Sequence, residues 1–308
     1  MHEQYKFMMI FKIKHSKKCL FNSFIFISLL QFSFPALAVQ TPQDLSDQAW
    51  EKNLRKQNFQ NRKIIEGIDQ NFQERKIIEG ADQEILEVKA PIMAEDASIV
   101  PLSIHTKIVQ TKERYIKKMH IFVDKNPMPL VGIFEFTPDS GKADLAMRIR
   151  INEYSYIRSV AELNTGELYM SKSFVKAKGA CSAPPPASMG DSIKLLGKMK
   201  MKVVGLVKLG RPNLMQIRVR HPNITGLAPE RPGSSVIPPA FFVDTLEVEY
   251  NNKPIVKALL TFSISMDPTL RFYFFPENEG ILTVTGTDTK SDKFSSTHAI
   301  NVWKPKNS

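Results

Sequence analysis

Hydrophobic and polar residues alternate with a period of two along much of the chain after residue 83. The pattern is clearest in residues 143–154, where four apolar side chains alternate with small or polar ones: Leu145, Met147, Ile149 and Ile151 against Ala146, Arg148, Arg150 and Asn152. Such alternation is typical of a strand with one buried face. Further strands are predicted at 84–88, 98–104, 117–124 and 129–136.

A second strand-rich block begins near residue 212. Met215, Ile217 and Val219 alternate with polar residues, and apolar runs follow at 241–250, 254–265, 270–276 and 280–288. The sequence NNKP between two of these runs favours a turn. Two blocks of roughly 100 residues each predict an all-β protein with two immunoglobulin-like antiparallel β-sandwich domains in tandem.

A different pattern precedes the first block. Thr41 can cap a helix whose first turn contains Pro42 and Asp44, and Leu45, Trp50 and Leu54 would share one side of it. The motif RKIIEG then occurs twice, thirteen residues apart, at 62–67 and 75–80. Two copies of so short a period are not a solenoid, so they indicate a local duplication that lengthens a linker.

The domain organisation that follows has five parts. We expect a signal peptide at 1–38, a helical or linker segment at 39–82, a first sandwich at 83–178, a cysteine-bearing arm and linker at 179–211, and a second sandwich at 212–303.

The first 38 residues have the layout of an export signal. Basic residues precede the apolar run LFNSFIFISLLQFSF, and Ala36 and Ala38 are the small residues expected at a cleavage site. The run is interrupted by polar residues and short for a membrane span of about 20 residues, although an uncleaved anchor stays an alternative. The sequence therefore predicts cleavage near Ala38, a periplasmic protein, and no stable membrane insertion after cleavage.

The chain is basic, with a formal net charge of +11, and loss of residues 1–38 would leave +7. In an exported protein this charge favours acidic protein partners or anionic small molecules. Nucleic acid is not an expected partner, because no arginine-rich or aromatic-interleaved basic patch is present.

Common catalytic motifs are missing from the sequence. There is no GxxxxGK[ST] loop, no GxSxG elbow and no GxGxxG after a strand. The mature chain keeps four histidines without metal-ligand spacing, namely His105, His120, His221 and His298. We therefore expect no metal, no cofactor and no enzymatic activity.

One cysteine remains once the signal is removed. Cys181 lies in KAKGACSAPPPASMG and cannot form an internal disulfide, so it is incidental, an intermolecular crosslink or a reactive thiol. Lys176 and Lys178 would stabilise a thiolate. Gly179, Ala180 and Ser182 carry little bulk and would let a partner approach the sulfur, and the prolines that follow would stiffen the segment.

The second block resembles SoxZ, the partner of SoxY in the SoxYZ carrier. The matching features run in order: Arg220-His221-Pro222, Thr225-Gly226, Ile237-Pro238 with Ala240-Phe241-Phe242, and residues 263–272. Residues 90–101 and the arm around Cys181 are similar to SoxY, whose Gly-Gly-Cys-Gly-Gly arm carries sulfur intermediates on its cysteine. The order of the two regions resembles SoxYZ-like fusion carriers associated with quinoprotein dehydrogenases.

This resemblance implies a function. A fusion carrier would hold a covalent sulfur adduct on Cys181 and present it to Sox-type enzymes, or to a quinoprotein (PQQ) alcohol dehydrogenase and its cytochrome. The alternative is a non-covalent docking protein for a periplasmic dehydrogenase or cytochrome, with an incidental cysteine. His221 is a candidate contact to the carried group, although a hydrogen bond that orients a turn is the favoured interpretation.

Overall fold

The computed structural model describes residues 40–66, 85–184 and 188–302. The predicted signal peptide, the second RKIIEG copy and Pro185 and Pro186 lie outside the described residues. None of the described helices is long and apolar enough to span a membrane.

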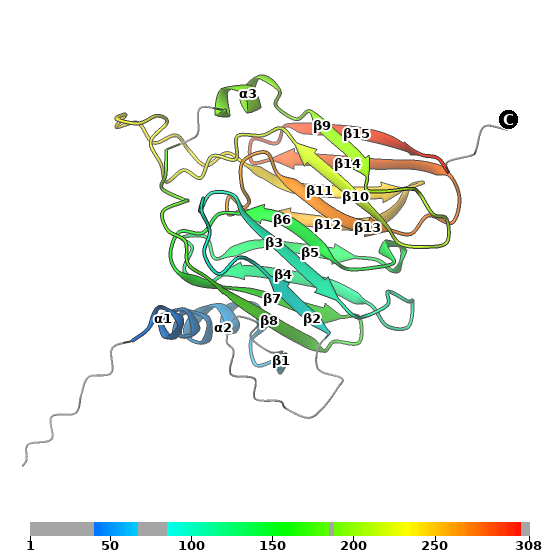
Figure 1. Ribbon diagram of the computed structural model, residues 1–308, viewed down its shortest axis with the longest axis horizontal. Helices are drawn as coiled ribbons and strands as arrows, with labels where there is room; N and C mark the ends of the chain where they lie inside the picture. The colour runs from blue at the N-terminus through cyan, green and yellow to red at the C-terminus, as the bar shows by residue number, and fades with distance from the viewer. Residues whose placement is uncertain (1–39, 67–84, 185–187, 303–308) are drawn as a thin grey trace, which may run out of the picture. The chain divides into compact units, whose positions relative to one another are not determined.

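Two β-sheets enclose the core (Figure 1). The first half of the fold contributes β1 to β8, which are Ile64–Glu66, Leu86–Lys89, Val100–Thr106, Ile116–Val123, Leu130–Phe136, Leu145–Ile149, Ser155–Leu163 and Leu168–Val175. The second half contributes β9 to β15, which are Met199–Val203, Asn213–Val219, Val243–Tyr250, Lys253–Leu260, Thr269–Phe274, Gly280–Asp288 and Lys293–Ile300.

Both sheets run through both halves. The nine-stranded sheet has the order β1-β8-β7-β4-β5-β12-β11-β14-β15, and the six-stranded sheet has the order β2-β3-β6-β13-β10-β9. The halves join where β5 pairs antiparallel with β12 and β6 with β13. The prediction of an all-β fold built from immunoglobulin-like sandwiches is confirmed, and the two sandwiches share one continuous core that includes Leu102 and Phe134 of the first half and Phe272 and Val284 of the second.

The predicted N-terminal helix is present. α1 (Pro42–Ala49) continues through a π-helical turn (Trp50–Leu54) into α2 (Arg55–Phe59). Thr41 and Asp44 form a capping box, each side chain accepting a hydrogen bond from the other residue's backbone N–H at 3.2 and 2.9 Å. Trp50 and Leu54 are buried as expected, whereas Leu45 is 40% exposed and does not belong to their face.

This helical segment covers the outer side of the nine-stranded sheet. Trp50, Leu54 and Phe59 pack with a second, smaller hydrophobic cluster that includes Phe122 and Val160 of the sheet. The first RKIIEG copy is more than a linker, because its residues form β1, which pairs parallel with β8. The predicted linker at 179–211 likewise contains regular structure, namely α3 (Met189–Lys194) and β9.

Candidate functional site

Cys181 lies on a short segment between β8 and α3, which we call the arm and define as residues 179–184. Four hydrogen bonds dock it. The N–H groups of Gly179 and Ala180 donate to the carbonyls of Asn152 and Ile151 at 2.8 and 3.4 Å. The Cys181 N–H donates to Asn152 Oδ1 at 3.3 Å, and the Cys181 carbonyl accepts from Thr225 Oγ1 at 2.7 Å. The arm is therefore held by residues of both halves.

The docked arm buries its thiol. Cys181 is 0% exposed, and burial raises the pKa of the thiol to about 11, against the opposing effect of Arg150. At pH 7 such a thiol is ionised in roughly one molecule in ten thousand. The expectation of an accessible, activated thiolate is therefore wrong for the docked arm, because desolvation outweighs the nearby positive charge.

Lys176 and Lys178 do not supply the positive charge near the Cys181 thiol. Lys178 Nζ lies 4.9 Å from the centre of the Tyr154 ring, and Lys176 pairs through its backbone with the 92–94 segment. Ser182 is exposed, as expected for a small residue beside the thiol, whereas Ala180 is buried. Gly179 has φ of +82°, a left-handed conformation that favours glycine, and a Cβ there would meet no neighbour within 4 Å.

Arg150 is the charged residue that the sequence analysis missed. It follows β6 directly and was expected to face solvent, but the 261–265 loop covers it, and it is only 7% exposed. Its Nη1 donates to the carbonyls of Phe262 and Ile264 at 2.7 and 2.5 Å, and burial lowers the pKa of the guanidinium to about 10. Among the described residues it forms no ion pair with a carboxylate.

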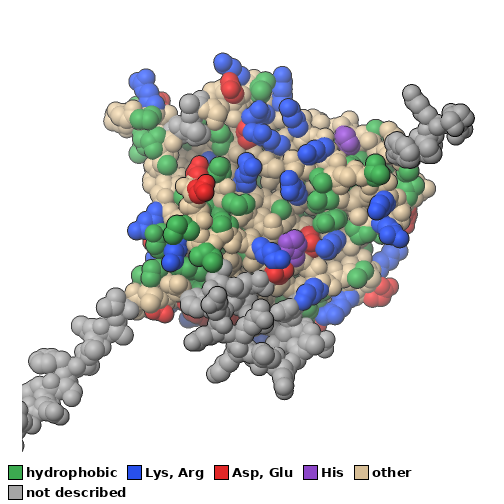
Figure 2. Space-filling model, in the orientation of Figure 1, with side chains coloured by type: hydrophobic (Ala, Val, Ile, Leu, Met, Phe, Trp, Pro, Cys, Tyr) green, Lys and Arg blue, Asp and Glu red, His purple; other side chains and the backbone are tan. Residues whose placement is uncertain are grey.

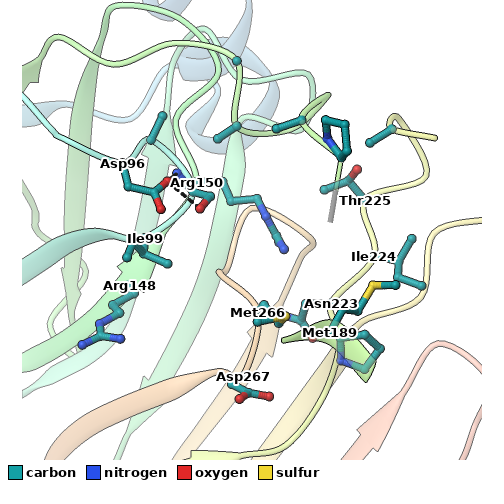
Figure 3. A pocket seen from close by; sticks show the side chains of 18 of the residues that line it. Asp96, Ile99, Arg148, Arg150, Met189, Asn223, Ile224, Thr225, Met266 and Asp267 are labelled. Atoms are coloured by element: carbon teal, nitrogen blue, oxygen red, sulfur yellow. Dashed lines mark hydrogen bonds between the residues drawn. The ribbon is translucent and has the colours of Figure 1, made fainter. Parts of the chain in front are cut away.

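A pocket of about 680 Å³ lies beside the arm and between the two halves. Figure 3 shows Arg150 pointing into it, between Ile99 and Thr225. Gly179, Ala180, Ala183 and Pro184 of the arm line one part of the pocket. The remaining wall is mixed in polarity and includes Asp96, Arg148, Lys178, Met189, Arg218, Asn223, Met266 and Asp267.

The pocket and the thiol thus share one wall, the arm itself. Arg150 is the group that relates them, because it lines the pocket and its charge acts on the Cys181 sulfur. A buried guanidinium that keeps free donors and no carboxylate partner can receive an anion. In the parts of the chain that the structure describes, no group of three or more His, Cys, Asp or Glu could hold a metal ion.

His221 is buried in the second half. Its Nδ1 accepts a hydrogen bond from the Asn223 N–H at 3.0 Å, and its Nε2 lies 3.5 Å from Asp288 Oδ2. Burial lowers the pKa of the ring, which keeps the ring neutral at pH 7. Asn223 itself has φ of +44°, so the histidine supports a turn of unusual backbone conformation. Its described contacts do not include the arm.

Comparison with protein families decides the identity of the two halves. Residues 68–181 match the model of "Sulfur oxidation protein SoxY", and residues 201–299 match that of "Sulphur oxidation protein SoxZ". The chain is a SoxY–SoxZ fusion. Its domains are those of a sulfur-oxidation carrier, and they imply interaction with enzymes of the Sox system. The SoxY match ends at Cys181, so the fusion places the arm where the first domain ends.

Solved structures similar to the fusion include the sulfur carrier protein SoxY from Chlorobium limicola f thiosulfatophilum. That protein is 21% identical over 43% of this chain and 96% of its own, with a TM-score of 0.32. A superoxide reductase (neelaredoxin) from Ignicoccus hospitalis is 12% identical over 31% of this chain and 82% of its own, with a TM-score of 0.28. No match is found among the curated proteins.

Proposed function

We propose that the fusion is a periplasmic carrier that holds a sulfur compound covalently on Cys181 and presents it to partner enzymes. The observation that carries this proposal is the arm. The chain's one described cysteine lies on a segment of small residues, docked by four hydrogen bonds, beside a pocket that contains a buried guanidinium. A docking site of this kind can release the thiol without disturbing the core of either sheet.

Loading of sulfur onto Cys181 requires release of the arm from its docked position. Joining the thiol to thiosulfate forms one sulfur–sulfur bond, sends the thiol proton to solvent, and passes two electrons to a redox enzyme that accepts them. The thiolate is the attacking form, and in the docked arm it is suppressed by burial. Loading therefore takes place on the released arm, where the pKa of the thiol returns toward its ordinary value.

The redocked arm offers a place for the charged end of the adduct. A thiosulfonate ends in a sulfonate, whose oxygens can accept hydrogen bonds from the donors of Arg150 that the backbone carbonyls leave free. The partners we propose are Sox-type enzymes or a quinoprotein dehydrogenase with its cytochrome. The protein itself needs no catalytic group, because the enzymes that load and unload Cys181 supply the chemistry.

Intact-mass measurement of the mature protein from its native periplasm tests this function. We expect a mass increase that maps to the peptide containing Cys181 and disappears with reductant. Cys181→Ser should prevent the increase and should fail to complement a deletion strain. Full complementation by Cys181→Ser would refute the proposal.

A second candidate function is favoured by the burial of the thiol. A fully buried cysteine with a pKa near 11 is also what an incidental core cysteine would show. The fusion would then be a non-covalent docking protein for a periplasmic redox enzyme. A bare thiol in protein isolated under inducing conditions, with full activity of Cys181→Ala, would select this function.

A further inference from the structure

The two sheets differ in how the charges on their outward faces are balanced. On the nine-stranded sheet, four residues on neighbouring strands form a cross-strand row that alternates in sign, namely Lys118, Glu135, Lys257 and Glu247. Lys118 forms an ion pair with Glu135 at 2.7 Å, and Lys257 forms one with Glu247 at 2.6 Å. Each charge in this row has an opposite neighbour, so the row is neutral.

The part of the six-stranded sheet formed by β6, β13, β10 and β9 has no such balance, whereas β2 at the other edge pairs Lys89 with Glu87. Lys200 on β9 lies directly opposite Arg218 on β10, and in the next row Lys202, Gln216 and Arg271 follow one another across β9, β10 and β13. Arg148 on β6 continues the positive charge toward the middle of the sheet. In the described strands β6, β9, β10 and β13, no outward-facing position is acidic. We call these five basic side chains the basic face.

The face is visible from outside. Figure 2 views it directly and shows Lys and Arg side chains gathered over the part of the sheet that β9 and β10 form. Lys200, Lys202, Arg148 and Arg271 are exposed, and the Arg218 side chain is 43% exposed. One buried carboxylate, Asp267, accepts from Arg218 at 2.7 Å and also from Arg220, so it cannot neutralise the face.

Like charges directly opposite each other destabilise a sheet. The nine-stranded sheet compensates such charges: in the Lys118 row every lysine faces a glutamate, and where Arg158 lies opposite Lys172, Asp47 forms an ion pair with both. The repulsion between neighbouring cations on the basic face does not help the protein to fold. It is therefore better explained by a partner that the face binds.

We propose that the basic face is the surface on which an acidic face of a partner enzyme docks while it exchanges cargo with Cys181. This inference rests on the proposed carrier function. Its position fits that role, because Arg148 and Arg218 also line the pocket beside the arm. The basic side chains thus reach from the edge strand β9 to the pocket beside the arm, whose lining also holds Glu95, Asp96, Glu230 and Asp267. Their charge steers an acidic entrance toward the arm.

An acidic protein fits this face better than other anions do. Single-stranded nucleic acid requires aromatic side chains on which bases stack, and Tyr273 is the one aromatic residue among the outward positions of the described strands β6, β9, β10 and β13. Membrane association through a surface helix requires an amphipathic helix with an apolar side. The face is instead a sheet of fixed, well-spaced charges, which suits carboxylates presented by a folded protein.

The test is a charge reversal on β9, Lys200→Glu with Lys202→Glu, against a matched control, Lys253→Glu with Lys293→Glu, on the other sheet. All four lysines are exposed. The β9 variant should keep its melting temperature, because Lys200→Glu replaces a like-charge pair with an opposite one beside Arg218. Binding to a purified Sox-type enzyme from the same source is measured by biolayer interferometry at low and high salt.

We expect the association rate constant of the β9 variant to fall about tenfold or more at low ionic strength, and that of the control to change less than about twofold. At roughly 0.5 M salt the difference should shrink to within about twofold. Equal losses for both variants would overturn the proposal. Tight binding of phosphatidylglycerol vesicles or a single-stranded oligonucleotide, lost in the β9 variant without any effect on enzyme association, would also overturn it.

The same measurement on Cys181→Ser separates this inference from the carrier function. Docking through the basic face does not need the thiol, so Cys181→Ser should bind at an unchanged rate. Unchanged docking with no adduct on the wild-type cysteine would refute the carrier function and leave the docking surface standing. An adduct on Cys181 together with an unchanged association rate of the β9 variant would refute the docking surface and leave the carrier function standing.

Discussion

The N-terminal helical segment and the cysteine arm both pack on the sandwich, but by different means. The helical segment inserts Trp50, Leu54 and Phe59 into a hydrophobic cluster and is tied down by buried polar groups. Arg158 is 1% exposed and reaches Asp124 at 2.8 Å and Asp47 of α1 at 2.5 Å. The arm buries only small side chains, those of Ala180 and Cys181, and has four hydrogen bonds.

This difference separates a structural attachment from a releasable one. Lifting the helical segment would expose large aromatic side chains, at a cost of several kcal/mol, and would take Asp47 away from Arg158 and Lys172. Lifting the arm exposes little apolar area and breaks hydrogen bonds that water can replace, each worth about 1 kcal/mol. We therefore expect the arm to open within the folded protein, whereas the helical segment leaves only as the domain unfolds.

The largest predicted effect concerns the helical anchor. Arg158→Met removes the ion-pair partner of the buried Asp124 carboxylate, which keeps only the hydrogen bond from Ser46, and also removes the partner of Asp47 on α1. The free energy of unfolding should therefore fall by about 3–5 kcal/mol. Denaturant unfolding followed by circular dichroism measures it. The control is Arg62→Met, which removes an exposed ion pair with Glu162 and should cost at most about 1 kcal/mol. Equal losses would contradict the anchoring role.

The second prediction is a dependence of arm release on alkaline pH. Burial raises the pKa of Cys181 from 9.0 to about 11, so the docked arm favours the neutral thiol. That stabilisation is complete below pH 9 and is lost as the pH rises through about 11. The alkylation rate relative to a peptide of residues 176–188 should be constant below pH 9 and then rise toward 100-fold, about the factor for two pKa units. A flat ratio in protein that stays folded would contradict docking.

A smaller effect is expected from the hydrogen bond that joins the arm to the SoxZ half. Thr225→Val keeps the volume and removes the donor to the Cys181 carbonyl, so the arm should be released about 5–10 times more often, as for 1–1.4 kcal/mol. Iodoacetamide alkylation at pH 8 measures this change. Thr137→Val removes a similar hydrogen bond, to the Pro254 carbonyl, and should leave the alkylation rate unchanged.

The smallest expected effect is that of the lysine beside the arm. Lys178→Gln should change the alkylation rate by less than about twofold, because the Lys178 ammonium group lies over Tyr154 and Arg150 is the cation that acts on the thiol. Arg150→Met should instead extend the alkaline rise to higher pH and to a larger final ratio, since the charge of Arg150 lowers the pKa of the docked Cys181. A larger effect of Lys178→Gln than of Arg150→Met would reverse this assignment.

Alternation predicted several strands that have one solvent-facing side, although β9 and β15, which also alternate, were not predicted. β6 and β10 expose every second side chain, and both were predicted from the sequence. β7 was missed because seven of its first eight positions are buried on both faces, with the core on one side and the helical segment on the other. A strand covered on both faces has no period-two pattern to detect.

The site was harder to predict than the fold, since it depends on contacts between distant residues. The sequence singled out Cys181 because it is the one cysteine after the signal. It could not reveal that the thiol is buried, because Asn152 and Thr225 lie 29 and 44 residues away from it along the chain. Arg150 was expected to face solvent from its place in the alternation, and only the path of the 261–265 loop buries it.

The joining of both sheets across the halves also fixes the stoichiometry of this carrier. Two separate chains that met along β5 with β12 and β6 with β13 would separate on dilution and could exchange partners. Here the connection between β8 and β9 keeps the SoxZ half at a high effective concentration beside the SoxY half at any protein concentration. Every molecule made is therefore a complete carrier, whatever its abundance in the cell.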